Sequence, residues 1–154
     1  MKRIWAAAVV VALGCSAPPP PTGPTFYADN LRDIHTWDKE TAAKGHYAYD
    51  AMIMSDPADA VPVLIAKLND KTPTAINDGL HEPVPVCTVA FHLLMKIFTM
   101  KPEAFDREGV WVMASDPSKN PIYMVKFRDD ETRERLAKRF HELGVQRGWV
   151  GRKP

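Results

Sequence analysis

The sequence predicts a mainly α fold, with a single helical domain over residues 26–154. Apolar residues recur at helical spacing in three segments, residues 57–68, 86–100 and 130–143, and this period is the primary signal of an amphipathic helix. The chain has 154 residues, of which 45% are hydrophobic and 25% charged. That composition is typical of one compact globular domain.

The first residues have the pattern of a secretory signal peptide. Lys2 and Arg3 form a positive n-region, and the ten residues Ile4–Leu13 form an apolar run. The run is too short to cross about 30 Å of hydrocarbon as a helix, whereas it has the length of a signal-peptide core. We therefore expect residues 1–14 to be removed by cleavage before Cys15.

Cys15 is the residue that assigns the chain to a compartment. The sequence Ala12-Leu13-Gly14-Cys15 resembles the lipobox of bacterial lipoproteins, in which the cysteine is acylated and becomes the first residue of the mature chain. The resemblance implies lipidation of Cys15, and hence a membrane as partner. Ser16 resembles the sorting rule of Gram-negative bacteria, which implies an anchor in the outer membrane facing the periplasm or the cell surface.

Residues 15–25 predict a tether between this anchor and the domain. Pro18–Pro21 and Pro24 cannot enter a helix interior or a sheet, and they favour extended polyproline II. The chain from Cys15 to Phe26 could span about 34 Å at 3.1 Å per residue. Such a stiff spacer would hold the domain clear of the lipid headgroups.

Residues 28–54 predict one or two helices, because they contain few helix breakers. The positions at helical spacing are Leu31, Ile34, Trp37, Asp38, Ala42, His46, Tyr49, Met52 and Ile53. A boundary follows, since Asp56 can cap the next helix and Pro57 suits a first helical position.

Residues 57–100 predict a central pair of helices. The apolar face of the first helix consists of Val61, Leu64, Ile65 and Leu68. We expect this helix to begin near Pro62, because proline breaks a helix interior. Residues 69–85 predict a loop. Residues 86–100 are apolar on most faces, which predicts a helix at the centre of the core.

The pattern AVPVLIAKLND, a loop and VAFHLLMKIF resembles the helical hairpins of HEAT-type repeats, which often place a proline at this point. The resemblance covers residues 57–100 and implies a HEAT-like core pair and a role in protein binding. We expect a compact domain and no solenoid. No second copy follows at a fixed spacing, and stacked repeats need about three units for stability.

Residues 109–127 have two interpretations. Two β-prone stretches flank a polar turn, which predicts a small β-hairpin. Alternatively, a helix capped by Asn120 runs on to Leu143. In either case a helix covers residues 130–143 and ends at Gly144. The predicted core consists of Val61, Leu64, Ile65, Leu68, Val89, Ala90, Leu93, Leu94, Ile97, Phe98, Leu136 and Phe140.

The charge balance argues against a nucleic-acid partner. Once Lys2 and Arg3 are removed with the signal peptide, 18 basic and 19 acidic side chains remain. There is no basic excess to attract phosphates. If Cys15 carries lipid, Cys87 is the only remaining thiol, so no intrachain disulfide can form.

Five histidines and Cys87 are the candidates for chemistry. The histidines at 35, 46, 81, 92 and 141 stand in no metal-ligand spacing, so we expect neither a metal nor a cofactor. Cys87 lies in the first turn of its helix, where a thiolate is favoured, but free cysteines are usually buried and inert. We therefore predict no catalytic residues and no enzyme activity.

Two hypotheses for function follow. The first is a lipid-anchored protein-interaction module, such as a scaffold, a pilot or an immunity-type binder. If the hairpin forms, Trp111 and Tyr123 are its expected partner-binding anchors, because such side chains dominate interface hot spots. The alternative is a small-ligand-binding or hydrolytic periplasmic protein. Its site would consist of His46, Asp50, Cys87 and His92, and it requires these side chains to converge in one pocket.

Overall fold

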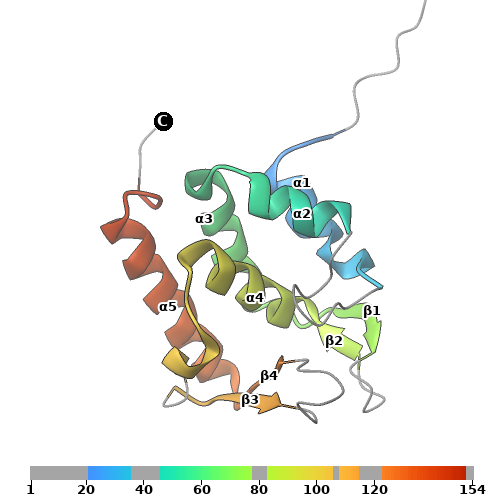
Figure 1. Ribbon diagram of the computed structural model, residues 1–154, viewed down its shortest axis with the longest axis vertical. Coiled ribbons are helices and arrows are strands. Elements are labelled where there is room, and N and C mark those ends of the chain that lie inside the picture. The colour runs from blue at the N-terminus through green and yellow to red at the C-terminus, as the bar shows by residue number, and fades with distance from the viewer. Residues whose placement is uncertain (1–20, 36–45, 78–82, 106–107, 115–122, 152–154) are drawn as a thin grey trace, which may run out of the picture.

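The computed structural model describes residues 21–35, 46–77, 83–105, 108–114 and 123–151. This part of the chain forms five α-helices, two short 3-10 helices and two antiparallel two-stranded hairpins (Figure 1). The elements are α1 Pro24–Asp29, η1 Asn30–Asp33, α2 Tyr47–Met54, α3 Pro57–Lys67, β1 Pro73–Asn77, β2 Pro83–Pro85, α4 Val86–Phe98, η2 Pro102–Phe105, β3 Val110–Ala114, β4 Tyr123–Phe127 and α5 Asp130–Gln146. The predicted mainly α fold with a small β-hairpin is confirmed.

Helix α4 is the centre of the domain, as its apolar sequence predicts. Every residue from Val86 to Met95 is buried, and so is Phe98. The helix packs against α2, α3, β2 and β4. Ten of the twelve predicted core residues are buried, and the other two, Ile65 and Ile97, are partly buried against the same core.

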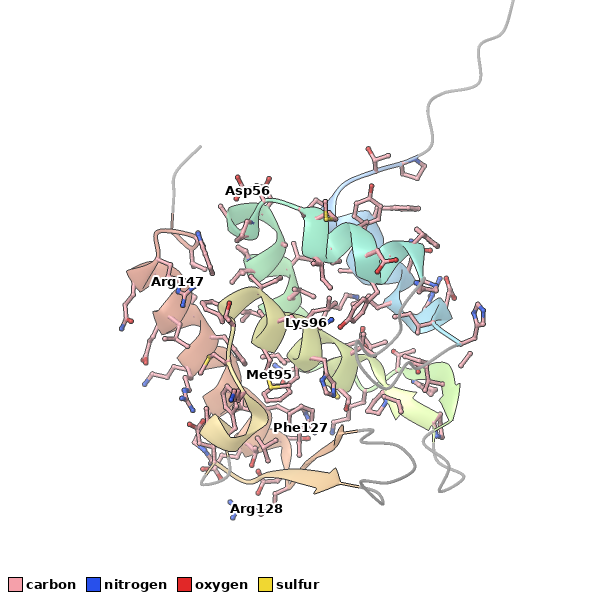
Figure 2. The ribbon with its side chains drawn as sticks, in the orientation of Figure 1. Asp56, Met95, Lys96, Phe127, Arg128 and Arg147 are labelled. Carbon is pink, nitrogen blue, oxygen red and sulfur yellow. The ribbon has the colours of Figure 1, made fainter. Side chains whose placement is uncertain are left out.

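Helix α3 begins directly after its capping residue, Asp56. The Asp56 carboxylate, at the start of α3 in Figure 2, accepts a hydrogen bond of 2.8 Å from the Ala58 N–H, and Pro57 occupies the first turn. The expectation of a start near Pro62 is wrong, because Pro62 lies inside the helix on its exposed side. A proline on the solvent side keeps its ring out of the core, and the cap upstream fixes the first turn.

Helices α3 and α4 pack on each other, but their connection is not the loop that the sequence predicts. Strands β1 and β2 pair antiparallel within it, with Pro73 opposite Pro85. The Thr74 hydroxyl donates a hydrogen bond of 2.7 Å to the Val84 carbonyl, and Ile76 and Val84 are buried. Prolines at the strand ends hide this hairpin from sequence patterns, since proline normally argues against a strand. The likeness of the α3–α4 pair to HEAT repeats stays a prediction.

The N-terminal helices are shorter than their pattern indicates. Helix α1 begins at Pro24, inside the range predicted as tether, and Leu31 and Ile34 are buried in and just after η1. Tyr49 and Met52 are buried on α2 as expected, whereas Ile53 is 36% exposed. Ile53 therefore shares the predicted helical spacing with Tyr49 and Met52 but not their burial. The predicted positions Trp37, Asp38 and Ala42 lie outside the described residues.

The region after α4 forms the hairpin and not the continuous helix. Strands β3 and β4 pair in regular register, from Val110 opposite Phe127 to Ala114 opposite Tyr123. Helix α5 then begins separately at Asp130. The Asp129 carboxylate accepts hydrogen bonds from the N–H and the hydroxyl of Thr132, at 2.7 and 2.6 Å. These bonds lower the pKa of Asp129 to about 2.

Helix α5 does not end at Gly144, as the sequence predicts, but continues to Gln146. The chain then turns through Gly148 at φ 68°. The N–H of Trp149 donates to the Gly144 carbonyl and the N–H of Gly148 to the Val145 carbonyl, which is a Schellman motif. Gly144 is buried inside the helix, where a Cβ would lie 2.5 Å from Val150 Cγ2. This glycine therefore serves close packing and not termination.

We expect Gly144→Ala to destabilise the domain by about 1–3 kcal/mol through overpacking, although alanine is normally favoured over glycine in a helix by about 1 kcal/mol. In a Val150→Ala background, which removes the clashing methyl groups, the same change should be neutral or stabilising. Urea unfolding of the two single variants and the double variant measures both effects. A stabilising Gly144→Ala in the wild-type background would show that Val150 does not constrain this position.

Candidate functional site

The side chains of the predicted anchor and partner-binding residues are not among those that the structure describes. Cys15 lies outside the described residues. The backbone of the hairpin pairs Trp111 with Lys126 and Tyr123 with Ala114, but neither aromatic side chain is among those described. Lipidation of Cys15 and partner binding by Trp111 and Tyr123 therefore remain predictions.

The structure places His46 and Cys87, from the alternative hypothesis, in different electrostatic surroundings. The charged and titratable groups that act on the pKa of His46 are His35, Asp33 and Asp50, of which Asp50 lies on α2. The pKa of Cys87, on α4, is raised chiefly by burial, and the charged residue that acts on it is Arg133. Within the described ranges, no three histidine, cysteine or acidic side chains are placed to hold a metal ion.

Cys87 is a buried thiol at the start of α4. Its N–H donates a hydrogen bond of 2.8 Å to the carbonyl of Asp70, just after the turn that follows α3, and this bond caps the start of α4. Burial raises the pKa of the thiol, and the positive charge of Arg133 offsets this only in part. The helix N-terminus therefore does not produce a reactive thiolate here, because desolvation of the charged form outweighs it.

A shallow cleft of about 240 Å³ lies between α1 and the end of α3. Its lining consists of Ala28, Asp29, Arg32, Lys67, Asp70, Thr72 and Val86. The Lys67 ammonium lies 2.9 Å from an Asp29 oxygen and 3.2 Å from an Asp70 oxygen. The hydrogen bond to Asp29 raises the pKa of Lys67 most, so this amine is a poor nucleophile. None of the four residues of the alternative hypothesis lines this cleft.

His46 is a buried residue at the cap position of α2, only 7% exposed. Its ring stacks on Tyr47 with 5.0 Å between centroids and meets His35 edge-on at 6.2 Å. In the described part of the chain, His46 Nδ1 and the Tyr49 hydroxyl are buried without a hydrogen-bond partner. Burial lowers the pKa of His46, the nearby His35 lowers it further, and Asp33 and Asp50 partly oppose the shift.

The outer side of α2 is an exposed apolar face, which we call the α2 face. Met54 is 84% exposed, Tyr47 52% and Ile53 36%. The same side contains partly buried Ala51 and a single charged residue, Asp50. Sequence reasoning missed this face. The available signal was the composition of α2, YAYDAMIM, in which Asp50 is the only charged residue. A helix that is apolar on nearly every side is normally covered on every side. Such a helix at the edge of a domain therefore indicates an exposed apolar face.

Comparisons with known proteins assign the chain to no group. It matches no protein-family model, no curated protein and no solved structure. In the described part of the chain, every helix is too short or too polar to cross a bilayer.

We expect the stability of the domain to fall as the pH falls from about 7 to about 5, because of His46. Its folded pKa is below the ordinary value of 6.5. The unfolded chain therefore takes up a proton before the folded chain does, and acid favours unfolding. His46→Gln should flatten this part of the profile. His141→Gln, on the exposed side of α5, is the matched control and should keep it. Urea midpoints across the pH range test this, and equal slopes in the His46→Gln variant and the wild type would contradict it.

Proposed function

We propose that this protein is a lipid-anchored cell-envelope protein whose helical domain is a protein-interaction module. The observation that carries the proposal is the N-terminal sequence: a positive n-region, a short apolar run, Cys15 and then a proline run. A scaffold, a pilot for an envelope assembly and an immunity-type binder all require a folded domain held at a membrane.

The arrangement of the domain supports this proposal. Helix α1 begins nine residues after Cys15, so only a short segment joins the folded part to the proposed anchor. The β3–β4 hairpin lies at the other end of the domain from α1 (Figure 1). A partner that binds Trp111 and Tyr123 on this hairpin would meet the side of the domain that faces away from the anchor.

The chemistry of the described residues also favours binding over catalysis. Cys87 is a neutral buried thiol and Lys67 is a doubly paired ammonium, so neither is prepared to attack a substrate. A nucleophile needs a depressed pKa or an adjacent base. Aromatic side chains on a hairpin, in contrast, need only a complementary surface on another protein.

Cys15→Ala should release the protein from the membrane fraction and abolish incorporation of labelled fatty acid. Cys87→Ala is the matched control, because it removes the other thiol and should leave fractionation unchanged. Fractionation of cells that express each full-length variant provides the measurement. A Cys15→Ala protein that stays in the membrane fraction would refute the anchor.

Affinity capture tests the partner. Wild-type protein extracted from its own envelope should retain a partner that both Trp111→Ala and Tyr123→Ala lose. Val145→Ala, on the exposed side of α5, should retain it. Identical captured proteins for all the variants would exclude the hairpin as the binding surface.

A further inference from the structure

We infer that the α2 face rests on the lipid surface to which Cys15 attaches the chain. This inference rests on the proposed lipid anchor. It assigns to the domain a second, non-covalent contact with the membrane, made by Tyr47, Ile53 and Met54.

Helix α2 exposes apolar side chains to solvent. The helix buries Ala48, Tyr49 and Met52 against the core, and it turns Met54 and Tyr47 to the outside. Single exposed apolar residues are common on protein surfaces, but a cluster on one helix marks an interaction site. The α2 face is therefore the candidate contact surface on this helix.

The α2 face lies near the point where the chain from the proposed anchor enters the domain (Figure 1). Helix α1 packs directly against α2, and the chain enters α1 beside α2 (Figure 1). The nine residues from Cys15 to Pro24 reach at most about 32 Å even when fully extended. Because the proposed lipid holds one end of this segment in the bilayer, the α2 face lies within reach of the membrane surface, and contact there replaces the clearance that the proline spacer predicts.

The α2 face is small. A specific protein–protein interface uses about 20–30 residues from each partner, whereas the α2 face belongs to a helix of 8 residues. Such a face is too small to hold a second copy or another protein by itself. It suffices to orient a domain that acyl chains already hold at the surface, since a second contact of a tethered module benefits from high effective concentration.

The side chains also determine the type of lipid contact. Tyrosine is enriched at the headgroup level, where an aromatic body and a polar tip are both accommodated. Typical interfacial helices carry lysine and arginine that bind anionic lipids. The α2 face contains no basic residue, only Asp50. We therefore expect apolar contact that does not depend on anionic headgroups.

The test uses the full-length lipidated protein with a spin label attached at Met54→Cys, in a Cys87→Ala background. The matched control carries the label at Val145→Cys on α5, which is also exposed. A second variant, Ile53→Cys, reports on the same face. Each protein is bound to vesicles of phosphatidylethanolamine, with and without phosphatidylglycerol. Collision with a water-soluble nickel reagent is then measured by electron paramagnetic resonance.

We expect nickel collision to fall several-fold at positions 54 and 53 on binding to either vesicle type, and to stay unchanged at 145. Attached protein with all three labels still accessible would overturn the inference and leave the lipid anchor intact. Protein that does not attach would overturn both proposals. Protection of position 54 in an unlipidated Cys15→Ala protein without vesicles would overturn the inference, because another part of the chain or a second copy would then cover the face. If nickel collision falls only in vesicles that contain phosphatidylglycerol, the contact depends on anionic headgroups, and the proposed apolar contact is wrong.

Discussion

The edge-to-face contacts of the Phe91 ring hold the C-terminal half of the domain together. Phe91 is buried on α4, and its ring centroid lies 5.1 Å from that of Phe105, 5.6 Å from Phe127 and 5.9 Å from Phe140. These three rings come from η2, β4 and α5, and Figure 2 shows Phe127 on the side of the domain where β4 approaches α4. A two-stranded hairpin is at best marginally stable in water by itself. The β3–β4 hairpin therefore depends on this cluster for its place on the domain.

Elements with strong local signals could be predicted from the sequence, and elements fixed by tertiary contacts could not. Asp56 and Asp129 cap their helices through their own neighbours, so local rules apply to them. The β1–β2 hairpin depends instead on pairing across ten residues, as in the bond from Thr74 to Val84. The local sequence around Gly144 predicts the end of a helix. In the structure, this glycine instead leaves room for Val150, which packs against it after the turn.

The candidate functional residues also differ in whether a local sequence signal or a tertiary contact determines them. The signal for lipidation of Cys15 is local, so the sequence alone can state the hypothesis. The state of the Cys87 thiol depends on two opposing effects, helix-terminal stabilisation and burial, and only the packed structure decides that burial is larger. The exposed α2 face was hidden because helical spacing shows which residues share a side, but not which sides other elements cover. Ile53 shares a helical spacing with the buried residues Tyr49 and Met52, yet its side chain is 36% exposed.

The N-terminal end of the domain must be firmly attached if a short tether is to position the rest. Helix α1 has only six residues, and an isolated helix of that length is not stable in water. Its attachment comes from burial of Ala28, and of Leu31 in the following turn, together with the ion pair between Asp29 and Lys67 of α3. Since Lys67 also binds Asp70, one ammonium connects α1, α3 and the turn that caps α4. The start of the described domain is thereby connected to the turn that caps the central helix.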